Sequence, residues 1–147
     1  ASGDAIVKGV NADALTVATS SGDIKLDSVS SKDTRISANS GDVSLGDVVM
    51  DNIDLKTSSG NITSGSIKAK CINGRASSGD VMIRECDASE INVVTTSGDV
   101  SIGIGSEMKY EYNTKTSSGD VNVPDSVEGA DGKCNIETSS GDIDVTQ

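Results

Sequence analysis

Hydrophobic and polar residues alternate along most of this chain, and the alternation restarts at regular intervals. Counted from the glycine of each Ser-Gly-Asp triplet, apolar residues prevail two and four positions after the glycine and five and seven positions before it. Around Gly98 these residues are Ile91, Val93, Val100 and Ile102. A period of two with many β-branched residues predicts strands. No window has the period of a helix, so we expect an all-β protein.

The triplet itself recurs along the whole chain. Its glycines are Gly3, Gly22, Gly41, Gly60, Gly79, Gly98, Gly119 and Gly141. The first five intervals between them are 19 residues long, and the last two are 21 and 22 residues long. A repeat of this size is typical of a solenoid, in which each coil buries the apolar side of its neighbours. We therefore predict one domain over 1–147, a single-stranded parallel β-helix (β-solenoid) with about 19 residues per rung and about eight rungs. We expect the coil to be right-handed, and each rung to pair with the rung that precedes it in sequence.

Every second residue of each strand faces inward, but across the triplet the spacing between inward residues rises from two to three. The chain must bend there, so we predict that the triplet forms a corner of the coil. Glycine permits the positive φ angle that such a corner needs. We interpret as structural turn residues the glycines Gly22, Gly41, Gly60, Gly79, Gly98, Gly119 and Gly141. The residues that follow them, all aspartates except Asn61, then form a column in which carboxylates one rung apart repel each other by about 1 kcal/mol in water. Either N–H groups of the same turn bind each carboxylate, or cations lie between the rungs.

The second interpretation makes metal candidates of Asp23, Asp42, Asp80, Asp99 and Asp120. We favour the first, because the chain lacks the nine-residue glycine-aspartate repeat of calcium-binding β-rolls. Without histidine or a Cys-x-x-Cys pair there is no zinc motif. We therefore expect no metal and no cofactor, and we expect the cysteines to be buried free thiols.

The amino-acid composition argues against several classes of function. The chain has 23 acidic and 12 basic residues, a formal net charge of −11, no histidine, and only two aromatic residues, Tyr110 and Tyr112. The acidity argues against nucleic acid as a partner, and the short apolar runs exclude a membrane-spanning helix. Catalytic motifs such as the G-x-S-x-G elbow and the phosphate-binding loop are missing. We therefore expect no enzymatic activity and no catalytic residue.

Three residues are candidates for ligand binding. Lys56 and Arg75 stand four positions before the glycine in adjacent rungs, where a basic stripe on an acidic rod offers an anion site, although a solvated face is the simpler interpretation. Tyr110 lies in the longer rungs at 99–147, whose extra residues we interpret as a cap of the open end rather than as binding loops. Tyr112 falls in an inward column, and we expect it in the core.

The first triplet begins at Ser2, and no signal-peptide pattern is visible before or around it. Because an open parallel edge invites pairing, we expect either an upstream cap or end-to-end self-association. The other expected partner is an unidentified protein, peptide or glycan at the cell surface. Neither nucleic acid nor membrane insertion is expected.

The unit T-S-S-G-D-[IV]-x-[LIV], found at 19–26, 116–123 and 138–145, resembles a bacterial family of β-strand repeats described as adhesins, a domain of unknown function. Similar domains occur in envelope-stress proteins of the LiaX and YvlB type. The resemblance implies a non-enzymatic binding or structural module of the bacterial cell envelope, in an extracytoplasmic or cell-surface location, and it supplies no catalytic residues. The alternative is a degenerate parallel β-helix that binds or cleaves polysaccharide.

Overall fold

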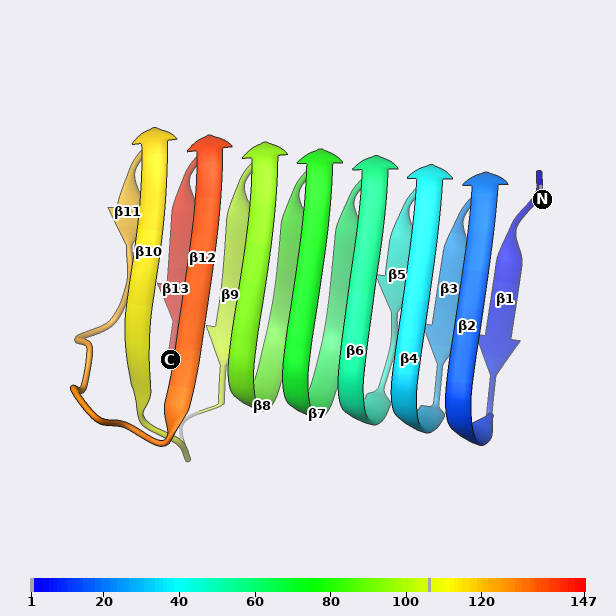
Figure 1. The fold of residues 1–147 in the computed structure, drawn as a ribbon, viewed down its shortest axis with the longest axis horizontal. Coiled ribbons are helices and arrows are strands. Elements are labelled where there is room, and N and C mark those ends of the chain that lie inside the picture. The colour runs from blue at the N-terminus through cyan, green and yellow to red at the C-terminus, as the bar shows by residue number, and fades with distance from the viewer. Residues whose placement is uncertain (1, 106) are drawn as a thin grey trace.

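The computed structural model describes residues 2–105 and 107–147, and within them it contains strands but no helix. The chain winds into a parallel β-solenoid of about 7 turns with ~19 residues per turn, as the sequence predicts. Figure 1 shows the strands stacked in two layers along one axis. No helix among the described residues is long and apolar enough to cross a membrane.

Each turn contributes a short strand to one layer and a longer strand to the other. The short-strand layer contains, in spatial order, β1 (Ala5–Lys8), β3 (Ile24–Asp27), β5 (Val43–Leu45), the first parts of β7 (Ile62–Ser78) and β8 (Val81–Ser97), β9 (Val100–Ile104), β13 (Ile143–Thr146) and β11 (Val121–Asn122). The other layer, called the long face below, contains β2 (Asn11–Ser21), β4 (Val29–Ser40), β6 (Val48–Ser59), the later parts of β7 and β8, β12 (Gly132–Ser140) and β10 (Tyr110–Ser118).

The core lies between the two layers and follows the inward columns predicted from the sequence. The column two residues after the triplet glycine includes side chains that are at most 1% exposed, namely Ile24, Val43, Ile62, Val81 and Val100. A buried side chain of this size stabilises the fold by about 1.5–3 kcal/mol relative to an exposed one. Because each one stacks on its equivalents in the neighbouring coils, the core is continuous along the axis.

The Ser-Gly-Asp corner requires glycine for two reasons. The φ angles of the seven predicted turn glycines lie between +144° and +149°, a region that residues with a Cβ atom rarely adopt. A Cβ atom on Gly41 would also lie 2.1 Å from the carbonyl oxygen of Gly22 in the neighbouring coil. The backbones of successive corners therefore pack directly against each other.

The last two coils are stacked in an order that differs from their order in the sequence. β12 pairs with β8 on one side and with β10 on the other, and β13 lies between β9 and β11. After β9 the chain passes over one coil position, forms the outermost coil with β10 and β11, and returns to fill the gap (Figure 1). The prediction that each coil pairs with the one before it in sequence is wrong here. The extra residues of the last two intervals span the outward and the return passage.

The inward side chains explain this order. The inner coil carries Ile136 and Ile143, which are 2% and 1% exposed. The outermost coil carries Thr114 in register with Ile136, and Val121, 43% exposed, in register with Ile143. A terminal coil has solvent on one side, so placing the more apolar coil inside buries more apolar surface.

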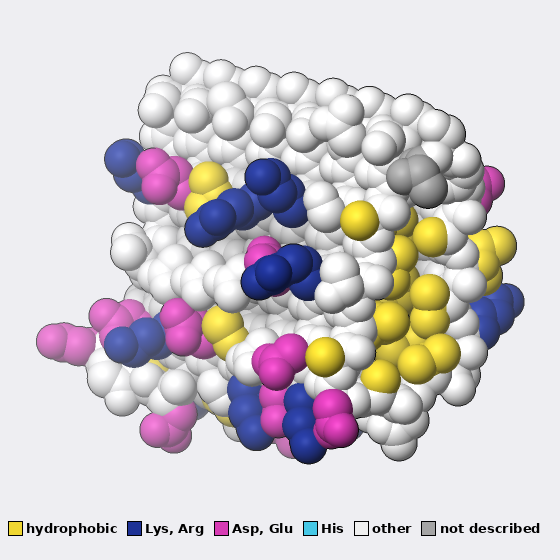
Figure 2. All heavy atoms as spheres, turned by 45° about the vertical axis from the view of Figure 1, so that its right-hand side comes forward, with side chains coloured by type: hydrophobic (Ala, Val, Ile, Leu, Met, Phe, Trp, Pro, Cys, Tyr) yellow, Lys and Arg dark blue, Asp and Glu magenta, His cyan; other side chains and the backbone are white. Residues whose placement is uncertain are grey.

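The two ends of the solenoid differ. Segment 123–131 covers part of the outer edge of β10, where the Val127 N–H donates to Tyr110 O at 3.0 Å and the Tyr112 N–H donates to the Ser126 hydroxyl at 2.9 Å. At the opposite end, β1 and β2 each pair on one side only among the described residues, and hydrophobic side chains gather there (Figure 2). An upstream cap or end-to-end association at that end stays a prediction.

Candidate functional site

The aspartate column at the corners forms a continuous ladder of hydrogen bonds. Oδ1 of each member except the last accepts the backbone N–H of the equivalent residue in the next coil, at 2.7–3.0 Å. In spatial order the members are Asp4, Asp23, Asp42, Asn61, Asp80, Asp99, Asp142 and Asp120. We expected each carboxylate to bind N–H groups of its own turn. It binds the adjacent turn instead, because stacking in register places that N–H within reach.

The ladder changes the electrostatics of the candidate metal ligands. A hydrogen bond from a backbone N–H to a carboxylate is charge-assisted and stronger than one between neutral groups, so the ladder offsets repulsion within the column. Asp23, Asp42, Asp80 and Asp99 each use Oδ1 in this way, and Asp120 lies in the outermost coil. In the part of the chain that the structure describes, no group of three or more histidine, cysteine, aspartate or glutamate side chains is placed to hold a metal ion.

A second ordered column runs along the long face, at the outward position six residues before the triplet glycine. We call it the asparagine column. In spatial order its members are Thr16, Arg35, Asp54, Asn73, Asn92, Asn135 and Asn113. Asn92 Nδ2 donates to Asn73 Oδ1 at 3.2 Å, and Asn135 Nδ2 donates to Asn92 Oδ1 at 2.8 Å. The column therefore sets hydroxyl, guanidinium, carboxylate and amide groups in one line.

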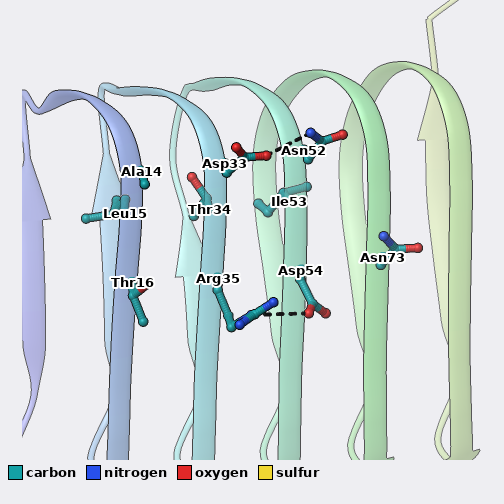
Figure 3. A pocket seen from close by; sticks show the side chains of 10 residues that line it. All are labelled: Ala14, Leu15, Thr16, Asp33, Thr34, Arg35, Asn52, Ile53, Asp54 and Asn73. Carbon is teal, nitrogen blue, oxygen red and sulfur yellow. Dashed lines mark hydrogen bonds and ion pairs between the residues drawn. The ribbon is translucent and has the colours of Figure 1, made fainter.

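Shallow hollows follow the asparagine column. The first has a volume of about 270 Å³, crosses β2, β4, β6 and β7, and is lined by the ten residues drawn in Figure 3. Within it, Arg35 Nε lies 3.7 Å from Asp54 Oδ2, and Asn52 Nδ2 donates to Asp33 Oδ1 at 2.8 Å. Both contacts join neighbouring coils, so they help to fix the positions of the polar groups in the hollow.

Two further hollows, of about 170 Å³ and 290 Å³, lie on the two sides of the asparagine column in the coils at its other end. Asn113 and Asn135 line both of them, and Tyr112 lines the larger one. Beside the asparagines, Lys115 Nζ lies 3.3 Å from Glu137 Oε1. The long face thus presents hollows at both ends of the asparagine column, one over its first four coils and two beside its last coils.

The predicted ligand-binding residues Lys56 and Arg75 lie on the same face. They are paired in register on β6 and β7, and both are exposed. The structure therefore brings the two cations side by side, as their spacing in the sequence predicts. Neither residue lines any of the three hollows on the asparagine column.

Tyr110, the third candidate, departs from the expectation. It is 1% exposed, and its hydroxyl donates to the Ala88 carbonyl oxygen at 2.6 Å. The Tyr110 ring occupies the space that a side chain at position 132 would need. A Cβ atom on Gly132 would lie 2.6 Å from Tyr110 Cδ1. Tyr110 therefore packs in the core of the C-terminal coils and is not available to a ligand. Tyr112, expected in the core, is only partly buried, and its hydroxyl lies 3.2 Å from Gln147 Oε1.

The cysteines are free thiols. Cys86 and Cys134 are buried, as expected, whereas Cys71 is half-buried. Burial raises the pKa of Cys86 and the pKa of Cys134 to about 12. Both thiols therefore stay protonated at neutral pH, and a protonated thiol is a poor nucleophile and metal ligand.

Sequence reasoning missed one further column, which lies ten residues after the triplet glycine. Its members Asp13, Lys32, Asp51 and Lys70 alternate in sign. Lys32 Nζ lies 2.7 Å from Asp13 Oδ1, and Lys70 Nζ lies 3.0 Å from Asp51 Oδ2. The alternation at 19-residue spacing is the signal that identifies it. Exposed pairs of this kind contribute about 0–1 kcal/mol each, so their main effect is to keep the column neutral.

Comparison with known proteins agrees with the repeat. No curated protein and no solved structure matches the chain significantly. The model of the Toastrack DUF4097 family, a domain of unknown function, matches residues 1–146 and so spans every Ser-Gly-Asp triplet. The chain belongs to the Toastrack DUF4097 family.

Proposed function

We propose that this domain is a non-enzymatic binding module whose long face binds an extended ligand along the asparagine column. The observation that supports the proposal is that hollows lie along this one column, one over its first four coils and two beside its last coils. A ligand laid along the solenoid axis meets polar groups coil after coil, about 4.8 Å apart. Many weak contacts made by one connected ligand then reinforce each other.

A glycan or an extended peptide suits this face better than a compact apolar molecule. The hollows are open, and their lining mixes amides, hydroxyls and charged groups with aliphatic side chains, whereas pockets for small molecules are concave and mostly apolar. The corner ladder joins the coils and holds the face in one shape. A pre-organised face loses little conformational entropy when it binds.

The proposal places the domain at the bacterial cell surface, outside the cytoplasm, in an adhesin-like role. Its partner there is a glycan, a peptide or a protein. The net charge of −11 disfavours nucleic acid. Affinity capture on the native cell surface, with the bound partner identified by mass spectrometry, tests both the location and the partner class.

Cleavage of polysaccharide is the competing function. It needs a pair of carboxyl groups that are free to act as acid and base or nucleophile. In the first hollow, Asp33 is engaged by Asn52 and Asp54 by Arg35, which favours binding without turnover. Release of reducing ends from a panel of polysaccharides by the purified domain, lost in Asp33→Asn, would establish the competing function.

A glycan and peptide array probed with the purified domain tests the proposed site. Asn92→Leu places an apolar group in the middle of the asparagine column and is expected to abolish the binding signal. Thr63→Leu adds the same group to the outward side of β7 in the short-strand layer, and this matched control is expected to bind like the parent. Unchanged binding by Asn92→Leu would exclude the asparagine column as the site.

A further inference from the structure

One pair of cations on the long face differs from the other basic residues of the solenoid. Lys56 and Arg75 are in register on neighbouring strands, so two positive charges stand one coil apart. Among the described residues, several other basic residues also have a charged residue in register or in an ion pair. In each of those cases the charged residue is acidic. These contacts are Lys8 with Asp27, Lys32 with Asp13, Arg35 with Asp54, Lys68 with Asp87, Lys70 with Asp51, Lys115 with Glu137, and Lys133 with Glu90 and Glu111.

The surroundings of the pair do not neutralise it. In its own column the pair is flanked by Ser37 and Val94. The nearest acid on the same strand and face, Asp54, forms an ion pair with Arg35 of the preceding coil.

Like charges directly opposite each other destabilise a sheet, so the pair is unfavourable in the absence of a counterion. The stacked aspartates at the corners differ, because backbone N–H groups bind them. Near the cations, Ser58 and Ser77 follow two residues later on the same strands, facing the same way. Their hydroxyl groups are hydrogen-bond donors. Two cations and two hydroxyls therefore lie on the same outward side of two neighbouring strands.

We propose that Lys56 and Arg75 form an anion site for a phosphate group carried as a monoester or as the free ion. The guanidinium presents a planar fork of N–H donors that matches two phosphate oxygens, and the ammonium adds a compact positive charge. A phosphate monoester carries nearly two negative charges at neutral pH, enough to balance both cations, whereas one carboxylate balances only one. The site lies beside the three hollows and does not depend on the ligand proposed for them.

Titration of the isotope-labelled domain, followed by amide NMR at constant low ionic strength, tests the site. The probes are inorganic phosphate, glucose 6-phosphate, glucose and acetate. Saturable shifts around Lys56, Arg75, Ser58 and Ser77 are expected with both phosphate probes and not with glucose or acetate. Tighter binding of glucose 6-phosphate than of inorganic phosphate would indicate a phosphorylated glycan as the source of the group, and the reverse order would indicate the free ion.

Paired variants separate the site from the overall charge. Lys56→Gln with Arg75→Gln removes the two facing cations and is expected to weaken phosphate binding by about tenfold or more. Lys32→Gln with Lys70→Gln changes the net charge equally, but removes cations that already have acidic partners. This control is expected to bind phosphate like the parent. All four residues are exposed, so both variants are expected to fold, which thermal melting checks.

Three results would overturn the anion site. They are the absence of saturable shifts with phosphate, shifts centred on another part of the surface, and equal loss of binding in the two double variants. Phosphate binding by a domain that binds nothing on the glycan and peptide array would uphold the anion site and count only against the function proposed for the hollows.

Discussion

Substitution of Gly60 by alanine tests how the corners stack. Gly60 has a φ of +149°, and a Cβ atom there would lie 2.1 Å from the Gly41 carbonyl oxygen. The strained backbone alone costs about 1–3 kcal/mol. Relief of the clash requires the two corners to separate, which weakens the bonds from the Gly41 N–H to Ser59 O and from the Asn61 N–H to Asp42 Oδ1. Each of these contributes about 1 kcal/mol, so we expect the free energy of unfolding to fall by about 3–5 kcal/mol.

A second glycine provides the matched control. Gly129 also has a positive φ, +72°, but a Cβ atom there would meet nothing within 4 Å. Gly129→Ala therefore carries only the backbone strain, about 1–2 kcal/mol. Urea unfolding followed by circular dichroism measures both variants, with the free energy extrapolated to water. Equal midpoints for Gly60→Ala and Gly129→Ala would refute the reasoning, because the carbonyl beneath Gly60 would then have no effect.

Four further predictions concern the core, the thiols and the surface charge. Val81→Asp, at a side chain 1% exposed, is expected to cost several kcal/mol, whereas Met82→Asp, at one 46% exposed, is expected to change the melting temperature little; a melt of Val81→Asp close to that of the parent would contradict the column assignment. A thiol reagent at neutral pH is expected to label half-buried Cys71 before buried Cys86, as mass spectrometry of the digest reports. The Cys86 thiol has its ordinary pKa of 9.0 in the unfolded chain and a pKa of about 12 in the folded protein. Its contribution to the free energy of unfolding is therefore complete below pH 9 and is lost as the pH rises from 9 to about 12. Urea midpoints measured across this pH range check the loss. A Lys/Arg-rich peptide is expected to bind weakly at low salt and to dissociate at high salt, because exposed ion pairs are screened over about 8 Å at physiological ionic strength; fluorescence titration at two salt concentrations checks this, and binding indifferent to salt would contradict it.

The sequence by itself determined the coil. Alternation along each strand is a local property, so the inward position of Val81 and the outward position of Met82 follow from the period alone. The corner glycines were equally predictable, because a sharp bend needs a residue without a Cβ atom. The register of Lys56 with Arg75 followed from their 19-residue separation.

The candidate site was predictable only in part. The spacing placed Lys56 beside Arg75, but the hollows depend on how long side chains from four strands turn towards or away from each other. Arg35 turns towards Asp54 of the next coil, for example, and this contact shapes the first hollow. Side-chain directions of this kind depend on neighbours in other coils, which the local pattern does not specify.

Only the tertiary structure decided which coil lies next to which at the C-terminal end. The coils ending at Gly119 and Gly141 carry the same triplet and the same alternation. The local pattern is therefore compatible with either coil in the outermost position. The choice depends on the total apolar surface that the stack buries, and Ile136 gains more from the inner position than Thr114 does. The same stacking turned Tyr110 into the core and gave every corner carboxylate except Asp120 an N–H from the adjacent coil. These features are contacts between distant parts of the chain, and they exist only once the coils are stacked.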